Sequence, residues 1–594
     1  MHPTSKAMLF SSALAAALMT GPGRGPTTLP PTDNSFLDPV FLAGNVCRAK
    51  AKQFSPALLA GARMAMRAAL AATDDDGPPL WDNLGSLSRP ITAKQPQAQR
   101  YFDQGLRLSI AFNHVEALRA FRKAQAIDPD CAMCYWGEAF ALGANINMPM
   151  MDEAVSPAVI AIAKARARAG GASAAEQAMI EALAQRYSAD ASADKAGLAN
   201  AYAEAMAAVH ARFPDDHEIA VLFADAVMNT TPWNYWQADG KTANGMIGAG
   251  IAAIEKVLSA NPDHPGAIHA YIHLTEASAD PWRAEPFADR LGALMPGAGH
   301  LVHMPAHTYL RIGRYADSIA VNRAAVAADE AYLAQVEIEG PYPAGYYPHN
   351  IHFVLASAQL VGDKDSVMWA IERLKGKVPE AVAAEIGWLQ NIVAAPYYAH
   401  AQFSDPDTVL GVADPGDGLP LVKAIWHYAR AVAFAAKGDG AAAEAEAATI
   451  ATIKEKSDWS VVIAWGVPAP DILSIAEQVV AARIAQAKGD ANAAVAAFEQ
   501  AVRIQDTLPY MEPAHWYYPV RQSLGAALLA AGRADEAARV FQQALVDSPN
   551  NGWALYGLAQ AQQALGDQSG RAATEAQLDK AWLGDRRALG LARL

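Results

Sequence analysis

Seven of the 15 histidines in this chain fall between residues 269 and 352, many of them three or four residues apart. The segment GHLVHMPAHTYLRIGRY (299–315) alone contains three. Side chains at this spacing share one face of a helix, and two histidines four positions apart on a helix form a familiar chelating pair. The sequence therefore predicts a metal centre with imidazole ligands, and the candidates are His269, His273, His300, His303, His307, His349 and His352.

One carboxylate accompanies these histidines. Glu276 lies three residues beyond His273 on the same predicted helix face, either as a ligand or as a group that orients an imidazole behind the metal. Imidazole nitrogens suit zinc, copper, iron and nickel, and the nearly all-histidine donor set favours copper, with zinc or iron as alternatives. A second interpretation is a polar pocket without metal, in which the histidines bind one another or relay protons.

A period of 34 residues positions the histidines. The segment AQRYFDQGLRLSIAFNHVEALRAFRKAQAIDPDC (98–131) has small residues at its positions 8, 20 and 27, phenylalanine at 24 and proline at 32. It resembles a tetratricopeptide repeat, which implies two antiparallel helices, A and B, that cross at small residues. The same register recurs along the chain, and we expect about ten repeats, beginning at Ala98, Ala132, His217, Pro265, Gly299, Pro348, Ala424, Ile475, Tyr518 and Gly552.

This resemblance implies an all-α fold: a right-handed α-solenoid of stacked helix pairs over residues 98–594, with a concave groove lined by A helices. Alanine is the best helix former, and alanine-rich segments such as GAAAEAEAAT agree with an all-α chain. In such repeats, positions 2, 5, 9 and 12 of the A helix face the groove.

The proline register places the histidines at those groove positions. Pro262 and Pro296 are 34 residues apart, both at position 32, which puts five histidines of the next two repeats in the groove. Because packed helices lie about 8–10 Å apart, these imidazoles can share one ion or a close pair. Pro305 at position 7 predicts that this A helix starts late and leaves His300 on a loop. We expect an inner square of ligands made by His269, His273, His303 and His307, which the other histidines complete.

Most of the chain is also similar to a group of bacterial tetratricopeptide-repeat proteins that carry CYWGEA, HMPAHTYLRIGRY, YYPHNIHF and EPAHWYYPVRQSLGAALLAAGR. That resemblance implies the fold but no reaction. The sequence contains no phosphate-binding loop, no G-x-S-x-G and no H-E-x-x-H, so it names no substrate.

Three insertions interrupt the repeats, at residues 143–157, 229–245 and 330–348. Long loops in compact proteins are often functional, so we expect some of them to close a pocket over the groove. The alternative is that their aromatic side chains only anchor the loops. The candidates for lining this pocket come from the insertions and from groove positions of earlier repeats: Trp136, Asp225, Trp233, Trp236, Tyr346 and Tyr347.

Two cysteines lie three residues apart in CAMCYW. In an exported protein Cys131 and Cys134 are expected to form a disulfide, whereas in the cytosol the pair would be free or redox-active. Copper(I) binding together with the methionines of NINMPMM is another alternative. A c-type haem site is excluded, because Tyr135 stands where that motif needs histidine.

Composition limits the partners and the location. A net charge of −14 argues against a nucleic-acid partner, which needs clustered lysine and arginine. Beyond the N-terminus no run of 18 apolar residues predicts a membrane span.

Residues 1–22 combine Lys6 with an apolar stretch and then a Gly/Pro tract, which is typical of a signal peptide, with a disordered tail as the alternative. We expect an N-terminal extension with one or two helices over 23–97, and a periplasmic or secreted protein, or a cytoplasmic one without a signal.

The leading hypothesis is an exported metalloprotein with a histidine-rich centre in the groove and a small-molecule or peptide ligand. Copper would imply an oxidoreductase acting on O₂ or small organic substrates, and zinc a hydrolase using metal-bound water. The alternatives are a scaffold that binds a peptide or protein partner, and a protein for metal storage or delivery without catalysis.

Overall fold

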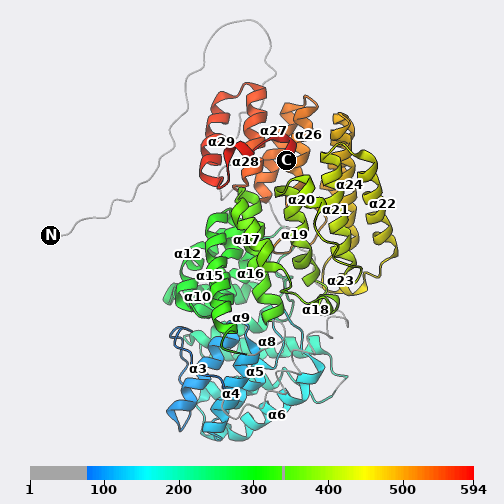
Figure 1. Ribbon diagram of the computed structural model, residues 1–594. Coiled ribbons are helices and arrows are strands. Elements are labelled where there is room, and N and C mark those ends of the chain that lie inside the picture. Colours follow the sequence, from blue (N-terminus) through cyan, green and yellow to red (C-terminus); the bar gives the residue numbers. More distant parts are fainter. Residues whose placement is uncertain (1–76, 191, 337–341) are drawn as a thin grey trace, which may run out of the picture. The chain divides into compact units, whose positions relative to one another are not determined.

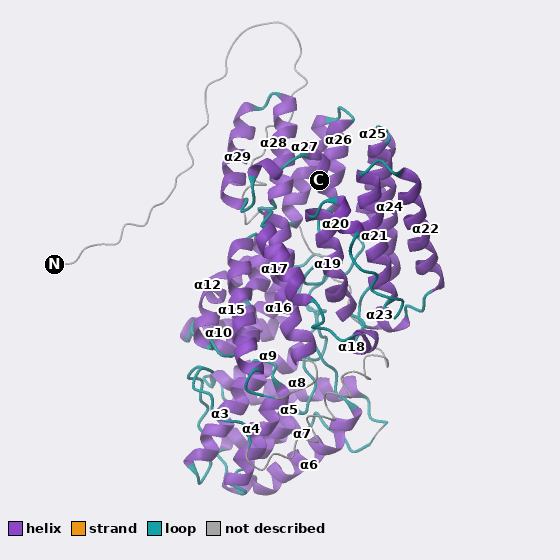
Figure 2. Cartoon of the chain, in the orientation of Figure 1, coloured by secondary structure: helices purple, strands orange, loops and turns teal. Residues whose placement is uncertain are grey.

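A computed structural model describes residues 77–190, 192–336 and 342–594. These residues form helices joined by loops, with no β-strand in the described ranges (Figure 2). The predicted signal peptide (1–22) and most of the N-terminal extension (23–97) lie outside them, and residues 77–95 form an irregular segment before the first described helix. Within the described ranges no helix combines the length and apolar character needed to cross a membrane.

Helices of the first half follow one another as packed pairs, from the blue to the green part of Figure 1. Their bounds are α3 (Pro96–Ile110) and α4 (His114–Ile127), α5 (Ala132–Ala141) and α6 (Asp152–Arg168), α7 (Ala174–Ala184) and α8 (Lys195–Arg212), α9 (His217–Met228) and α10 (Ile247–Ala260), α11 (Pro265–Glu276) and α12 (Glu285–Leu294), then α13 (Gly299–His303) and α14 (Pro305–Ile312) with α15 (Tyr315–Leu333).

The second half continues the pattern with shorter connecting helices between some pairs. Its bounds are α16 (Tyr347–Val361) and α17 (Lys364–Leu374), α18 (Glu380–Glu385), α19 (Leu389–Phe403) and α20 (Pro406–Leu410), α21 (Pro420–Ala436) and α22 (Gly440–Lys456), α23 (Ser460–Ala464), α24 (Ala469–Ala487) and α25 (Ala491–Gln505), α26 (Val520–Ala530) and α27 (Ala534–Asp547), α28 (Gly552–Leu565) and α29 (Gln568–Ala581). Each of the ten expected repeat starts lies within or next to the first helix of a pair. The pair α7–α8 and the helix α19 have no counterpart in the predicted set.

The small and aromatic positions of the repeat explain how neighbouring pairs pack. A Cβ atom at Gly105 or at Gly137 would lie within 2.6 Å of the Phe121 ring, so both positions admit only glycine without displacing that ring. Phe121 is fully buried between its own A helix and the next one. The all-α solenoid predicted from these positions is confirmed.

Glycine and aspartate set the turns between A and B helices. Gly489 has a φ of 76°, a left-handed conformation that ends α24. The Asp490 side chain then accepts a hydrogen bond from the backbone N–H of Ala493 and caps α25. The same Gly-Asp pair separates α16 from α17, at Gly362 and Asp363. Local sequence thus fixes where each helix ends.

The last repeats contact the repeats that carry the histidines. The Trp553 indole N–H on α28 donates to the Gln359 carbonyl on α16 at 2.8 Å, and the Leu583 N–H donates to the Val361 carbonyl at 2.9 Å. In a simple solenoid each repeat touches only its sequence neighbours. This chain therefore brings segments from widely separated repeats to the same place.

One feature of the predicted connections changes in the structure. Part of each outer insertion is helical: α6 begins at Asp152, α15 continues to Leu333, and a π-helical turn at Tyr342–Tyr346 leads into α16. Asp152 and Glu153 lie in the first turn of α6, where acidic side chains favour a helix start.

Cys131 and Cys134 are joined by a buried disulfide at the start of α5.

Candidate metal centre

The histidine-rich segment folds as two short helices rather than one late-starting helix. Pro305 occupies the first turn of α14, where its missing N–H costs no hydrogen bond. The Met304 N–H donates to the His300 carbonyl at 3.0 Å, so the preceding turn is also helical. The expectation that His300 lies on a loop is therefore wrong, because the proline starts a new helix without unwinding the turn before it.

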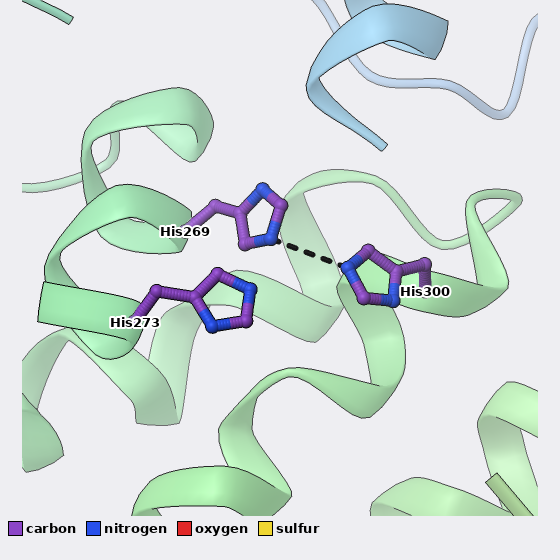
Figure 3. A group of neighbouring side chains, drawn as sticks. All are labelled: His269, His273 and His300. Carbon is purple, nitrogen blue, oxygen red and sulfur yellow. Dashed lines mark hydrogen bonds between the residues drawn. The ribbon is translucent and has the colours of Figure 1, made fainter. Parts of the chain in front are cut away.

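Six imidazoles gather in two groups of three, and within each group one ligand atom per residue lies within 4.8 Å of the others. His269 and His273 of α11 meet His300 of α13, and Figure 3 shows these three rings side by side. The second group combines residues of α13, α14 and α16, namely His303, His307 and His349. The predicted inner square is thus divided between the two groups.

The first group has the spacing of two ligands on one ion. The Nε2 atoms of His269 and His300 are 3.2 Å apart (Figure 3), and two nitrogens bound tetrahedrally at 2.0–2.1 Å lie about 3.3 Å apart. His273 Nδ1 donates to Glu276 Oε1 at 2.7 Å, which leaves the lone pair on Nε2. That Nε2 atom is buried and has no hydrogen-bond partner in the described part of the chain.

The second group places two acceptor nitrogens against each other. The Asn322 amide donates to the Ser318 carbonyl, so its Oδ1 atom faces His303 and accepts from His303 Nδ1 at 2.6 Å. His307 Nδ1 donates to Glu276 Oε2 at 2.6 Å. Both remaining Nε2 atoms therefore carry lone pairs, and they are 2.8 Å apart. Such lone pairs repel each other unless a proton or a metal ion lies between them.

Glu276 connects the two groups. Its Oε1 atom accepts a hydrogen bond from His273 of the first group, its Oε2 atom accepts one from His307 of the second, and its side chain is fully buried. A carboxylate behind a histidine fixes the tautomer and makes the other nitrogen a better ligand. Of the two roles expected for Glu276, this geometry corresponds to the orienting one.

Sequence reasoning missed a second carboxylate. Glu512, in the segment between α25 and α26, forms an ion pair with His307 Nδ1, and Tyr510 donates its hydroxyl to Glu276 Oε2 at 3.4 Å. Glu276, His307 and Glu512 form a third group that could hold a cation. The one available signal was the stretch 509–517, which the 34-residue period leaves between two repeats.

Burial and the carboxylates divide the protonation states. Burial holds the pKa values of four imidazoles well below the ordinary range, which keeps them neutral as metal ligands must be; these are His269, His273, His300 and His303. Burial acts in the same direction on His307, but Glu276 and Glu512 outweigh it and raise the pKa of His307 to about 10. The proton held there is the charge that a bound metal would replace.

Aromatic rings enclose the imidazoles. Phe112 lies 4.7 Å from the His269 ring and 5.0 Å from the His300 ring, and Trp233 meets His273 edge-on at 5.2 Å, measured between ring centroids. Both aromatic residues have left-handed backbones, with φ of 56° and 63°. Bulky residues rarely adopt this conformation, and such strain clusters at functional sites.

A cavity of about 140 Å³ adjoins both groups. His273 and His300 of the first group and His307 and His349 of the second line it, together with Glu512. All three predicted insertions contribute to its wall, through Asn147, Met148, Trp233, Ala344, Gly345 and Tyr346. Trp233 and Tyr346 are therefore the pocket-lining candidates that the structure places here.

Four other candidates lie elsewhere. The Trp136 indole donates to the Met179 carbonyl inside an earlier repeat, and the Trp236 indole donates to the Leu274 carbonyl and anchors its loop on α11. The Tyr347 hydroxyl donates to Glu330. Asp225 lines a smaller space of about 60 Å³ behind His269 and His273, where burial raises its pKa to about 6. The three aromatic side chains contribute to packing and do not line the cavity beside the histidines, so the prediction is corrected for Trp136, Trp236 and Tyr347.

His352 lies on the cavity wall but in neither group of three. The face of α16 that meets the second group carries His349 and Phe353, whose rings lie 4.9 Å and 4.7 Å from the His303 ring. Those two residues are four positions apart and share a helix face, which leaves His352 beside it.

Comparison with known proteins concerns the helical repeats alone. Tetratricopeptide-repeat family models match residues 479–507 and 528–569. A search of the curated proteins finds none that matches this chain.

Three solved structures are similar to the chain at low identity. Yeast Tom70 is 12% identical over 82% of this chain and 92% of its own, with a TM-score of 0.26. Human IFIT1 with m7Gppp-AAAA is 10% identical over 83% and 90%, with a TM-score of 0.30. The P58(IPK) TPR domain is 13% identical over 80% and 99%, with a TM-score of 0.19.

Proposed function

We propose that this tetratricopeptide-repeat protein is a metalloprotein that binds two transition metal ions, one in each group of three histidines. The observation that carries the proposal is the pair of acceptor nitrogens, His303 Nε2 and His307 Nε2, at 2.8 Å. Their hydrogen bonds to Asn322 and Glu276 occupy both Nδ1 atoms, so either a proton on His307 Nε2 or a metal ion lies between the two Nε2 atoms.

The charges of the site support a divalent ion. Four of the imidazoles are neutral because burial lowers their pKa values. Glu276 and Glu512 place two buried carboxyl groups at the same site, and burial together with the neighbouring Glu276 raises the pKa of Glu512 to about 8. A buried carboxylate needs a compensating cation, and a metal at the imidazoles supplies it after the His307 proton leaves.

Copper is the expected metal, because Cu²⁺ binds nitrogen ligands more tightly than the other first-row divalent ions do. Copper beside this cavity would support an oxidoreductase that acts on O₂ and a small organic substrate. Zinc in the same place would support a hydrolase in which metal-bound water attacks. Metal analysis of the purified protein distinguishes these two cases.

The test is the metal stoichiometry of protein prepared without a histidine tag and dialysed with copper or zinc. The wild-type chain is expected to retain two ions. The double variants His269→Ala/His300→Ala and His303→Ala/His349→Ala should each retain one, with unchanged helix content. His352→Ala, which changes a histidine on the same cavity outside both groups, should retain two. Equal metal content in all four proteins would overturn the proposal.

A peptide-binding scaffold is the second candidate function. The C-terminal repeats carry an open groove of about 1060 Å³, lined by residues of α19, α21, α24, α26 and α28. Tyr428 and Arg483 lie on its wall. Fluorescence anisotropy with labelled extended peptides tests this role: binding that is lost in Tyr428→Ala and Arg483→Ala, with metal content unchanged, would support it.

A further inference from the structure

We propose that the cavity beside the two histidine groups binds a neutral single-ring phenol, whose hydroxyl donates a hydrogen bond to Glu512. The role of this phenol as a substrate rests on the proposed metalloprotein function. The binding itself follows from the size of the cavity, the character of its walls and one buried oxygen.

The size of the cavity corresponds to one aromatic ring. It measures about 140 Å³, and an apolar protein cavity of about 150 Å³ takes up benzene. A second fused ring with substituents, or a peptide, would exceed this space. The occupant is therefore a small molecule.

The walls select an uncharged and largely apolar occupant. Trp388 and Trp465 line the cavity with Tyr346, next to Ile386 and Ile392. Among the described residues that line it there is no lysine, arginine or aspartate. A charged ligand would lose its hydration here, which is costly, and the cavity-lining His307 is already paired with Glu276 and Glu512.

The polar atoms of these walls are mostly paired with one another. The Trp465 indole donates to the Glu385 carbonyl at 2.9 Å. The Trp233 indole donates to Asn147 Oδ1, and the Asn147 amide donates to the Tyr346 hydroxyl, both at 3.2 Å. Because these groups already have hydrogen-bond partners, they do not need a polar ligand. The flat face of an aromatic ring can pack against them.

A buried carboxyl oxygen on the cavity wall lacks a donor. Glu512 lines the cavity with 8% of its surface exposed, and its Oε1 atom has no hydrogen-bond partner in the described part of the chain. A buried acceptor left without a donor is destabilising. A ligand hydroxyl supplies that donor, and the oxygen that bears it would then lie next to the imidazoles of His307 and His349, which line the same cavity.

Isothermal titration of the full chain, both metal-free and metal-loaded, tests this inference. Phenol is expected to bind one site in both forms. Cyclohexanol, which keeps the hydroxyl but lacks the aromatic ring, should bind at least tenfold more weakly, and so should benzoate, which is charged. Equal affinity for all three compounds, or no heat with phenol, would overturn the inference.

Variants locate the binding site. Ala464→Phe places a ring in the cavity from its half-buried rim and should abolish phenol binding. Trp388→Leu should weaken it about tenfold. Trp369→Ala removes a tryptophan that stacks with arginines outside the cavity and should leave phenol affinity unchanged. Helix content and melting temperature, measured for each variant, separate blocked binding from misfolding; phenol affinity unchanged in a folded Ala464→Phe protein contradicts the inference.

The two proposals fail in distinguishable ways. Phenol binding to a chain that takes up no metal would overturn the proposed metalloprotein and leave the cavity assignment intact. A chain that binds two metal ions but no phenol would overturn the cavity assignment and leave the proposed metalloprotein intact.

Discussion

Two regions built from the same helix pairs differ in what lies between their A helices. In the C-terminal repeats the Phe541 ring fills the space against Gly525 and Gly557, as Phe121 does near the other end of the chain. In the histidine repeats, formed by α11–α16, six imidazoles and Glu276 of neighbouring A helices come together, and one A helix is divided at Pro305. The same architecture thus supports either dry packing or a buried polar centre.

The difference concerns how stability is supplied. Apolar packing needs no ligand, whereas buried polar groups stabilise a fold only when their hydrogen bonds and charges are satisfied. In the histidine repeats, the Nε2 atom of His273 has no partner in the described part of the chain, and two acceptor nitrogens face each other. We therefore expect the stability of these repeats to depend on a cation, and that of the C-terminal repeats not to.

The largest expected effect on stability comes from the apolar packing of the C-terminal repeats. Phe541→Ala removes a fully buried ring, and such substitutions lower the free energy of unfolding by about 3–5 kcal/mol. Chemical denaturation should show this loss with and without a chelator. The folded protein should still hold both metals; a variant that folds but has lost its metals would show that the two regions are not independent.

Metal removal should act on the other region. Metal at a hundredfold excess over its dissociation constant stabilises the folded state by about 2.7 kcal/mol. Hydrogen exchange after chelation should therefore become faster in α11–α16 and stay unchanged in α21–α25. Uniform acceleration along the chain, or none, would remove the distinction drawn between the regions.

A smaller effect, on metal affinity, is expected when the carboxylate that orients the histidine ligands is changed. Glu276→Gln keeps a side chain of similar shape but weakens the hydrogen bonds to His273 and His307, and loss of such an orienting group costs about 10–100-fold in metal affinity. Competition with a chromophoric chelator measures this change. Glu446→Gln, which alters the carboxylate paired with His427 in the C-terminal repeats, is the matched control and should leave metal affinity unchanged. Complete loss of one ion in Glu276→Gln would make Glu276 a ligand.

The smallest effect is the release of about one proton per chain when metal binds at pH 8. Glu276 and Glu512 outweigh burial and raise the pKa of His307 to about 10, so the metal-free protein holds a proton that the metal displaces. Calorimetry in buffers of different ionisation enthalpy measures the release, and metal binding without it would contradict the assigned protonation.

The sign of the stability change follows from the same shift. The folded pKa of His307 lies above the unfolded value of about 6.5. Its contribution to the metal-free protein is therefore complete below about pH 6.5 and is lost as the pH rises to about 10.

The sequence predicted the parts that depend on local spacing. The 34-residue period located the helix pairs, because glycine at Gly105 and phenylalanine at Phe121 must meet wherever two helices cross this closely. The repeat register, fixed by Pro262 and Pro296, predicted that histidines of neighbouring A helices would meet. The division into two groups was not predictable, because it depends on side-chain directions on both sides of Pro305.

The remaining parts depend on contacts distant in sequence. Glu512 reaches His307 because the C-terminal repeats contact the histidine repeats, through pairs such as Trp553 and Gln359. Nothing in a repeat period indicates that return. Both Tyr346 and Tyr347 were expected at the pocket, but of the two Tyr346 lines the cavity and Tyr347 does not, because adjacent helical residues face different directions.

Diffraction at the metal absorption edge, from crystals grown with copper or zinc, tests the central claim most directly. Two anomalous peaks are expected, one bounded by His269, His273 and His300 and one bounded by His303, His307 and His349. A single peak between Glu276, His307 and Glu512, or no peak at the histidines, would contradict it.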